Sequence, residues 1–291
     1  MIQSKRCLLI VNSGSRAGKL IGGAAHGMLH QLGYVAARFD SPSPEAVSPW
    51  IQEHAHGADF VMIAGGDGTM NAAARGLLAT GLPLAILPAG TANDLARTLG
   101  IGDGIERAVA LPLSGRRVRI DLGEVNGHLF FNVASIGLSA DLAQALTADA
   151  KRRYGRFSYV LAALRALRAI HPFRAVVTHD GEAVEVRSLQ IAIGNGRYYG
   201  GGNAVHHEAR IDDAALDLYS LELRRLWKLT LMYPSFKRGR HSLWREVRAA
   251  RGDHFKVWTK KARPVNLDGE LKTWTPASFS IIPAAIEVFI P

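Results

Sequence analysis

Short apolar segments and helix-like segments alternate along the first part of the chain. Four apolar runs are typical of buried strands: Arg6–Asn12, Val35–Phe39, Asp59–Ala64 and Leu84–Leu87. Three further segments have helical character: Leu20–Leu32, Glu45–His56 and Asn71–Leu78. Strands that alternate with helices predict an α/β domain with a parallel sheet, in which ligands bind at the carboxyl ends of the strands.

The pattern changes near residue 116. Asn126-Gly127 separates two apolar runs, Val118–Val125 and His128–Ala134, and this dipeptide is typical of a two-residue β-hairpin. After a helix-rich insertion at Leu138–Ile170, further short strands follow: Arg174–His179, Ala183–Ile193, Leu216–Glu222, Phe255–Thr259 and Ser278–Ile282. Many short strands joined by turns predict a mainly antiparallel β-sandwich domain.

These patterns place a domain boundary near residue 120. We predict an α/β domain over residues 1–120 and a β-sandwich domain over residues 121–283, with the helical insertion at 138–170. The last apolar run, Ala285–Ile290, is expected to return to the first domain, so that residues 284–291 belong with it.

The composition is that of a globular protein with a substantial core, because 48% of the residues are hydrophobic. No apolar run approaches the roughly 18 residues that a membrane-spanning helix needs. The N-terminus leads directly into a strand and lacks the pattern of a signal peptide. We therefore expect a cytoplasmic protein without a transmembrane segment.

The net charge of +10 is concentrated in two segments. Residues 151–179 carry seven Lys or Arg and no acid, and residues 224–251 carry nine Lys or Arg and one Glu. Such segments suit anionic lipid or nucleic acid, but no RNA- or DNA-binding signature accompanies them. Apolar residues at helical spacing in 154–170 predict an amphipathic helix, which either packs on the core or touches lipid headgroups.

Three glycines follow the third predicted strand: Gly65, Gly66 and Gly68 surround Asp67. A glycine-rich turn between a strand and a helix aims backbone N–H groups at one point, where the helix dipole favours an anion. The turn therefore predicts a phosphate site. An acidic residue inside it would repel phosphate unless a cation lay between them, which suggests Mg²⁺ at Asp67.

A second turn of the same kind follows the next predicted strand. Gly90 and Thr91 end that strand and begin a helix. One such turn is compatible with an ordinary tight turn, but two turns at the same edge of a parallel sheet favour a nucleotide site.

The two motifs together resemble a known family. Residues 65–69 read GGDGT and residues 88–100 read PAGTANDLARTLG, which is similar to the diacylglycerol-kinase-type catalytic domain in its bacterial soluble lipid kinase branch. The resemblance implies the fold of that family, ATP and Mg²⁺ as cofactors, and transfer of the γ-phosphoryl group to a lipid hydroxyl. GGDG alone is also found in NAD kinases and phosphofructokinases, whereas the second motif is more specific to lipid kinases.

The resemblance also implies a set of nucleotide-binding residues: Asn12, Gly14, Ser41, Gly65, Gly66, Asp67, Gly68, Thr69, Asn71, Gly90, Thr91 and Asn93. Two positions depart from the family pattern. Ser13 stands where relatives have Pro, and Ala72 stands where relatives commonly have Glu. Ser41 corresponds to a family Thr only after a one-residue shift, and a helix-capping turn explains it equally well.

A glycine track at residues 194–202 and the segment that follows it also match the family. The resemblance implies that Asp213, with the backbone carbonyls of Arg210 and Ala215, holds a Mg²⁺ ion. Ala214 replaces the family glycine, which could distort this loop. The alternative explanation of the segment is a polar β-turn.

The segment Pro264–Glu270 contains the sequence N-L-D-G-E, to which the family assigns the general base. Transfer of phosphate to an alcohol needs a carboxylate that accepts the hydroxyl proton. We favour Glu270 as the base and Asp268 as its partner, with both facing the cleft. Asp-Gly is also a common hairpin turn, which is the structural alternative.

The sequence therefore predicts a lipid kinase that acts at an anionic membrane surface with peripheral association; a homodimer is possible. The rival enzyme is an NAD kinase-like phosphotransferase. The rival of another class is a non-catalytic nucleotide-binding regulator at membranes, because Ala72 and Ala214 depart from the family. The acceptor lipid is left open among diacylglycerol, phosphatidylglycerol, ceramide and sphingosine-type alcohols.

Overall fold

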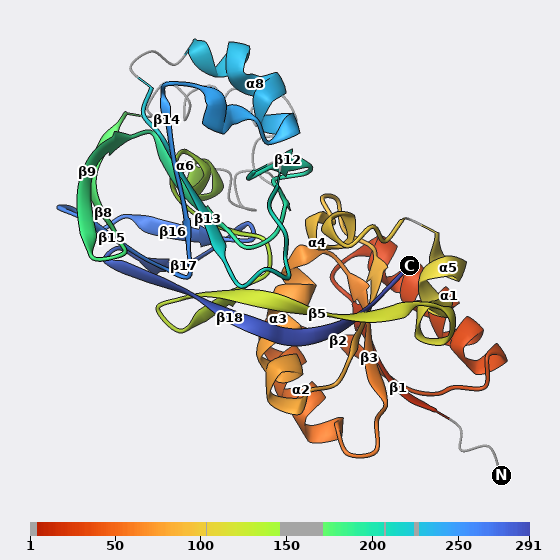
Figure 1. Cartoon of the computed structure of the whole chain (residues 1–291). Helices are drawn as coiled ribbons and strands as arrows, with labels where there is room; N and C mark the ends of the chain where they lie inside the picture. Colours follow the sequence, from red (N-terminus) through yellow and green to blue (C-terminus); the bar gives the residue numbers. More distant parts are fainter. Residues whose placement is uncertain (1–4, 103, 146–170, 207, 224–226) are drawn as a thin grey trace.

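Two lobes of the molecule share one long β-sheet (Figure 1). The computed structural model describes residues 5–102, 104–145, 171–206, 208–223 and 227–291. Within these residues the long sheet has ten strands, and its main path runs β2-β1-β3-β4-β18-β15-β8-β9. The parallel half of this sheet lies in the first lobe and the antiparallel half lies in the second.

The first lobe has the parallel α/β arrangement that the sequence predicts. Its strands are β1 (Arg6–Asn12), β2 (Val35–Ser41), β3 (Phe60–Gly65) and β4 (Leu84–Pro88), which pair in parallel. Its helices are α1 (Arg16–Gln31), η1 (Pro44–Ala46), α2 (Val47–His54), α3 (Asp67–Thr80), α4 (Asp94–Thr98) and α5 (Ile105–Ser114).

Two of these helices begin earlier than the sequence predicts. The side chain of Ser15 accepts a hydrogen bond from the N–H of Gly18, so α1 starts at Arg16 instead of Leu20. The third helix, α3, starts at Asp67, four residues before the predicted start at Asn71. The glycine loop is therefore the first turn of this helix and not a loop in front of it.

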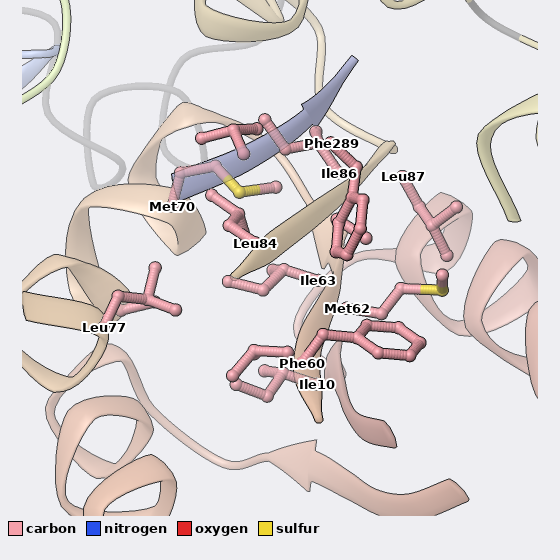
Figure 2. Close-up of a cluster of buried hydrophobic side chains, with 14 of the residues drawn as sticks. Ile10, Phe60, Met62, Ile63, Met70, Leu77, Leu84, Ile86, Leu87 and Phe289 are labelled. Carbon is pink, nitrogen blue, oxygen red and sulfur yellow. The ribbon is translucent and has the colours of Figure 1, made fainter. Parts of the chain in front are cut away.

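The core of the first lobe lies around β3, on which all six residues are buried (Figure 2). Phe60, Met62 and Ile63 lie in a cluster with Met70 and Leu77 of α3. A strand with both faces covered needs apolar residues at every position, which explains why its sequence shows a continuous apolar run.

The second lobe is a sandwich of two sheets, as predicted. One sheet has six described strands: β14 (Val247–Gly252), β13 (Leu216–Leu221), β10 (Gln190–Gly194), β7 (Val133–Gly137), β16 (Pro264–Leu267) and β17 (Glu270–Trp274). The facing sheet contains β8 (Phe173–His179), β9 (Glu182–Ser188) and β15 (His254–Thr259). Buried residues of both sheets, such as Phe255, Phe279 and Ile191, form one cluster between them.

The last strand connects the two lobes. The predicted strands Ser278–Ile282 and Ala285–Ile290 form one strand, β18 (Ala277–Ile290), which pairs along most of its length with β5 (Arg116–Val125). The register shifts between Ile282 and Ile286, and this irregularity breaks the sequence pattern into two parts without ending the strand. Near its end, Val288 pairs in parallel with Leu84 of β4.

Three hairpins of the second lobe have two-residue turns with positive φ at both positions. They are Asn126-Gly127 between β5 and β6 (His128–Phe130), Asp180-Gly181 between β8 and β9, and Asp268-Gly269 between β16 and β17. Such turns match the twist of the strands that they join, and Asn, Asp and Gly adopt positive φ most readily.

The helical insertion predicted at 138–170 is described only in its first part, α6 (Leu138–Ala145). The predicted amphipathic helix at 154–170 lies outside the described residues. A further helix, α8 (Lys228–Arg238), was not predicted; it contains Pro234 and is followed by η2 (His241–Leu243). Two short strands, β11 (Tyr198–Tyr199) and β12 (Asn203–Ala204), form a hairpin in the same lobe.

Phe279→Ala should lower the free energy of unfolding by about 3–5 kcal/mol, because Phe279 is fully buried between the two sheets and its removal leaves a cavity. Thermal unfolding followed by circular dichroism measures this loss. Leu20→Ala, at a side chain that is 67% exposed, is the control and should change the midpoint little. Similar midpoints for the two variants would contradict the placement of Phe279 in the core.

Candidate functional site

A cleft of about 300 Å³ lies at the carboxyl edge of the parallel strands. It is lined by residues from five connections: Asn12, Gly14, Ser15, Ser41, Pro42, Ser43, Pro44, Val47, Gly66, Gly68, Thr69, Ala89, Gly90 and Glu270. Most of the predicted nucleotide-binding residues therefore meet in one place. We name it the glycine-loop cleft.

The N-terminus of α3 lies at this cleft. Gly66 is the residue before the helix, and Gly68 and Thr69 belong to its first turn. The first N–H groups of a helix have no partner within the helix, and the helix dipole adds positive potential there. The local geometry suits an anionic group such as a phosphate.

The two glycine turns touch back to back. A Cβ atom added to Gly90 would lie 2.6 Å from the Cα of Gly66, and one added to Gly66 would lie 2.9 Å from the Cα of Gly90. Asn93 shapes the second turn, since its Oδ1 accepts the Gly90 N–H and its Nδ2 donates to the Gly90 carbonyl. Only glycine at positions 66 and 90 permits this approach.

The end of the first strand is fixed to the glycine loop. Asn12 donates its Nδ2–H to Thr69 Oγ1 at 3.2 Å and accepts the N–H of Gly14 at 3.0 Å. Gly65 packs against Thr69, where an added Cβ would come within 2.5 Å of Oγ1. Ser41 lines the cleft, and its hydroxyl donates to the Ser43 carbonyl, so it does not cap the helix that follows. Thr91, also predicted in the set, is exposed and does not line the cleft.

Asp67 occupies a different position from the predicted one. Its carboxylate accepts the backbone N–H groups of Asp94 at 3.1 Å and Leu95 at 3.0 Å, so it closes the N-terminus of α4. It does not line the glycine-loop cleft. Both oxygens of Asp67 are used to hold the backbone of α4, and its role toward Mg²⁺ stays a prediction.

Asp94 connects the first lobe to the glycine track of the second. Its buried carboxylate accepts the N–H groups of Gly201 and Gly202, both at 3.0 Å. Burial raises the pKa of this carboxyl above its ordinary value, although the two N–H donors oppose the shift. Gly200, Gly201 and Gly202 all have positive φ, which explains the three successive glycines.

Asp268 is the first of the two residues in the turn between β16 and β17. Its carboxylate accepts the N–H groups of Phe131, Asn132 and Val133 at 2.8–3.0 Å, and Asn71 Nδ2 of α3 donates to it at 3.2 Å. Burial raises its pKa to about 6 despite these four donors. The prediction that Asp268 faces the cleft is therefore wrong, because this carboxylate is used to hold the backbone.

Glu270 projects into the glycine-loop cleft from the same turn. A Cβ added to Gly68 would lie 3.3 Å from Glu270 Oε1, which shows how closely the side chain approaches the first turn of α3. Lys272 forms an ion pair with Glu270, with 2.6 Å between Nζ and Oε2. Glu270 thus brings a partly exposed carboxylate next to the glycine loop at residues 65–69.

A second cleft of about 310 Å³ adjoins the first. Pro44, Gly68 and Glu270 line both clefts. The remaining lining residues are Glu45, Ser48, Asn71, Ala72, Arg75, His128, Leu129 and Lys272. Glu270 therefore lies at the junction of two adjacent cavities.

The predicted Mg²⁺ site at residues 210–215 does not fit a cation in this arrangement. Arg251 Nη2 lies 2.5 Å from Asp213 Oδ2, and the other oxygen of Asp213 accepts the N–H of Ala215. Arg210 forms a separate pair with Asp212. A guanidinium group already neutralises the only predicted carboxylate ligand, so the geometry argues against a metal ion there. We derive no function from a metal at this loop.

Comparisons with known proteins agree with the sequence motifs over both lobes. Residues 6–125 match the family described as diacylglycerol kinase catalytic domain, and residues 132–290 match the YegS C-terminal NAD kinase beta sandwich-like domain. A protein of Pseudomonas aeruginosa named probable lipid kinase YegS-like is 36% identical over 256 residues, which cover 83% of this chain and 80% of the relative. The chain belongs to the YegS and diacylglycerol kinase family.

Other family members match over a similar extent. A diacylglycerol kinase of Mycobacterium tuberculosis is 31% identical over 284 residues, covering 94% of this chain and 84% of the relative. The crystal structure of a diacylglycerol kinase from Bacillus anthracis covers all of this chain and 98% of that one, with a TM-score of 0.74 and 21% identity. The likeness to the Bacillus anthracis structure, at 21% identity, concerns the fold alone.

The sequence pattern did not predict that Asp94 and Asp121 hold backbone N–H groups of distant segments. Asp94 lies inside the second motif, but nothing in the motif says that its partners are Gly201 and Gly202. Asp121 is buried and accepts the N–H groups of Ala214 and Ala284, both at 2.7 Å. Ala214 keeps a left-handed φ of 55°, so the loop retains the glycine-like conformation despite the substitution.

The stability of the protein should depend on pH through Asp268. Because its pKa is about 6 in the folded protein and 3.8 ordinarily, the folded state holds this proton more tightly than the unfolded state. The stabilisation by this group is complete below its ordinary pKa and is lost as the pH rises through about 6. Wild type should therefore lose stability relative to Asp268→Asn between about pH 4.5 and about pH 7.

Chemical unfolding of both proteins across this pH range measures the difference. Glu185→Gln, at an exposed carboxylate on β9, is the control and should follow the wild-type curve. Parallel curves for wild type and Asp268→Asn would show that the folded-state pKa is not raised.

Proposed function

We propose that this family member is an ATP-dependent lipid kinase, which transfers the γ-phosphoryl group of ATP to the hydroxyl group of a membrane lipid. The proposal rests on one observation above the others: Glu270 stands beside the glycine loop, at the junction of two clefts. The names of the relatives, lipid kinase and diacylglycerol kinase, support a lipid as the acceptor.

The glycine-loop cleft is the place for the phosphates of ATP. Backbone N–H groups at the start of α3 supply hydrogen bonds without adding negative charge. Lys272 adds a cation near the same point. Preorganised donors of this kind stabilise charge that develops on the transferred phosphoryl group.

Glu270 is the group that we propose as general base. The acceptor hydroxyl must lose its proton as it attacks phosphorus, and a carboxylate within hydrogen-bonding reach can take it. A hydroxyl group at the junction of the clefts would pass Glu270 on its way to a phosphate held by the glycine loop. Asp268 holds the turn that carries Glu270, because it accepts backbone N–H groups of Asn132 and Val133. Lys272 orients the Glu270 carboxylate through their ion pair.

Mg²⁺ is the counterion that kinases commonly use to neutralise and orient ATP phosphates. Within the described residues, no cluster of three or more acidic, histidine or cysteine side chains could hold a metal ion. Of the residues that line the glycine-loop cleft, Glu270 is the acidic one. We therefore propose that any Mg²⁺ enters with the nucleotide, held mainly by phosphate oxygens.

No helix among the described residues is long and apolar enough to cross a membrane. We propose that the enzyme is cytoplasmic and reaches its lipid by peripheral association with the membrane surface.

Transfer of labelled phosphate from ATP to a panel of lipids and to NAD tests the function directly. Label on a lipid alcohol supports the proposal, and label on NAD alone would establish the rival acceptor. Nucleotide binding without transfer to any acceptor would favour a regulator.

Glu270→Gln should reduce turnover by a factor of about 10²–10⁴ while leaving ATP affinity nearly unchanged, because the amide cannot accept the proton. Steady-state phosphoryl transfer and equilibrium binding of ATP measure the two effects separately. Glu106→Gln, on α5 and away from both clefts, is a matched control. Full turnover of the Glu270 variant would exclude it as the base.

Gly90→Ala should weaken ATP binding by about tenfold or more, because the new methyl group would meet the Gly66 backbone and force the two turns apart. Gly23→Ala provides the control, since a Cβ at this position of α1 has no neighbour within 4 Å. Isothermal titration calorimetry with ATP compares the two. Equal affinities would mean that contact between the turns is unimportant for the nucleotide.

A further inference from the structure

The outward side of α8 and η2 carries large apolar side chains that the fold leaves exposed. Trp227 is 55% exposed, Leu231 57%, Tyr233 54% and Leu243 78%. Trp227 caps the start of α8, Leu231 and Tyr233 lie on α8, and Leu243 lies on η2. Tyr233 follows Leu231 by two positions, about 200° round the helix, so the two side chains leave α8 on different sides. We name this surface the α8–η2 face, and it includes the basic residues described below.

Buried side chains hold α8 against the second lobe. Met232 and Phe236, on the opposite side of the helix, are buried and pack in the core cluster that includes Tyr219. Leu231 lies four positions after Trp227 and seven before Arg238, a spacing that places the three on one outward stripe. The helix is thus apolar on its inner side and carries a second, separate apolar stripe on its outer side.

Basic side chains surround this outer stripe. Lys237, Arg238, Arg240 and Arg245 are exposed, and the ammonium group of Lys237 lies 5.6 Å from the centre of the Tyr233 ring. The nearby carboxylates are already paired: Glu246 with Lys228, and Glu222 with Arg248. The described part of the face is therefore both apolar and strongly positive.

In Figure 1, α8 lies at the top of the second lobe, beside β12. The helix covers the end of the six-stranded sheet, next to β12, and its outer side has no described element over it. A flat membrane could approach this end without meeting the parallel sheet.

We propose that the α8–η2 face is the surface by which the protein docks on an anionic lipid membrane. The inference rests on the proposed lipid kinase function and names the part of the chain that brings the enzyme to its substrate. Leu231, Leu243 and Trp227 insert into the headgroup region, while the surrounding Lys and Arg side chains meet acidic headgroups.

The chemistry of the face favours a membrane over the other large anions. Trp and Tyr are enriched at membrane interfaces, where an apolar ring and a polar tip both find a suitable environment. A basic face with exposed leucines gains from apolar insertion and from electrostatic attraction together. Nucleic acid would satisfy the charges and leave exposed leucines such as Leu243 in water.

The experiment compares two double variants of the face with two matched controls. Leu231→Gln/Leu243→Gln removes apolar insertion, and Arg238→Glu/Arg245→Glu reverses two charges. The controls are Leu20→Gln/Leu113→Gln, at exposed leucines of the first lobe, and Arg187→Glu/Lys256→Glu, at exposed cations of the other sheet of the second lobe. Sedimentation with phosphatidylglycerol–phosphatidylcholine vesicles and with pure phosphatidylcholine vesicles measures binding.

Both face variants should bind the anionic vesicles at least about tenfold more weakly than wild type, and both controls should bind like wild type. Wild-type binding should fall steeply with salt and be weak on pure phosphatidylcholine. Unchanged binding by the face variants, or equal losses in the controls, would overturn the proposal. Absence of wild-type binding to either vesicle would also overturn it and would point to a protein partner for the face.

Phosphoryl transfer to a short-chain diacylglycerol in detergent micelles separates this inference from the proposed function. Face variants that keep full activity in micelles and lose vesicle binding support docking through this face. A wild-type protein that binds vesicles but phosphorylates no lipid would refute the kinase and leave the docking surface standing. Loss of micellar activity in the face variants would show that α8 serves the site itself and would contradict a docking role.

Discussion

The site depends on one buried carboxylate more than on any other group. Asp268 accepts three backbone N–H groups from the segment before β7 and one side-chain N–H from Asn71 on α3. Each of these donors would be costly to bury without a partner. By satisfying them together, Asp268 fixes the hairpin turn that carries Glu270 against the helix that carries the phosphate-binding loop.

Two other carboxylates, those of Asp94 and Asp121, also accept backbone N–H groups from distant segments. Asp94 holds the glycine track at Gly201 and Gly202, and Asp121 holds Ala214 and Ala284. In each case a carboxylate serves two backbone N–H groups of distant segments. Together with β5 and β18, which run through both lobes, these contacts make the cleft a fixed feature of the fold, so the reacting groups need little rearrangement to meet.

Positive potential is found in two separate regions, the glycine-loop cleft and the α8–η2 face. At the glycine-loop cleft, positive potential comes from the N-terminus of α3, which suits a phosphate at short range. At the α8–η2 face, it comes from exposed Lys and Arg side chains beside apolar ones, which suits a broad anionic surface. The two regions are lined by different residues, so they need not compete for one ligand.

The sequence alone determined the local features of this protein. Apolar runs identified the parallel strands, the glycines marked the two turns after β3 and β4, and Asn-Gly and Asp-Gly marked the hairpins, because periodicity and backbone conformation are set by neighbouring residues. The tertiary structure decided which groups each carboxylate meets. Asp67 and Asp268 were expected in the cleft, yet both bind backbone N–H groups, while Glu270 lines the cleft beside Gly68. These partners lie on segments far apart in the chain, and only the packing of the two lobes brings them together.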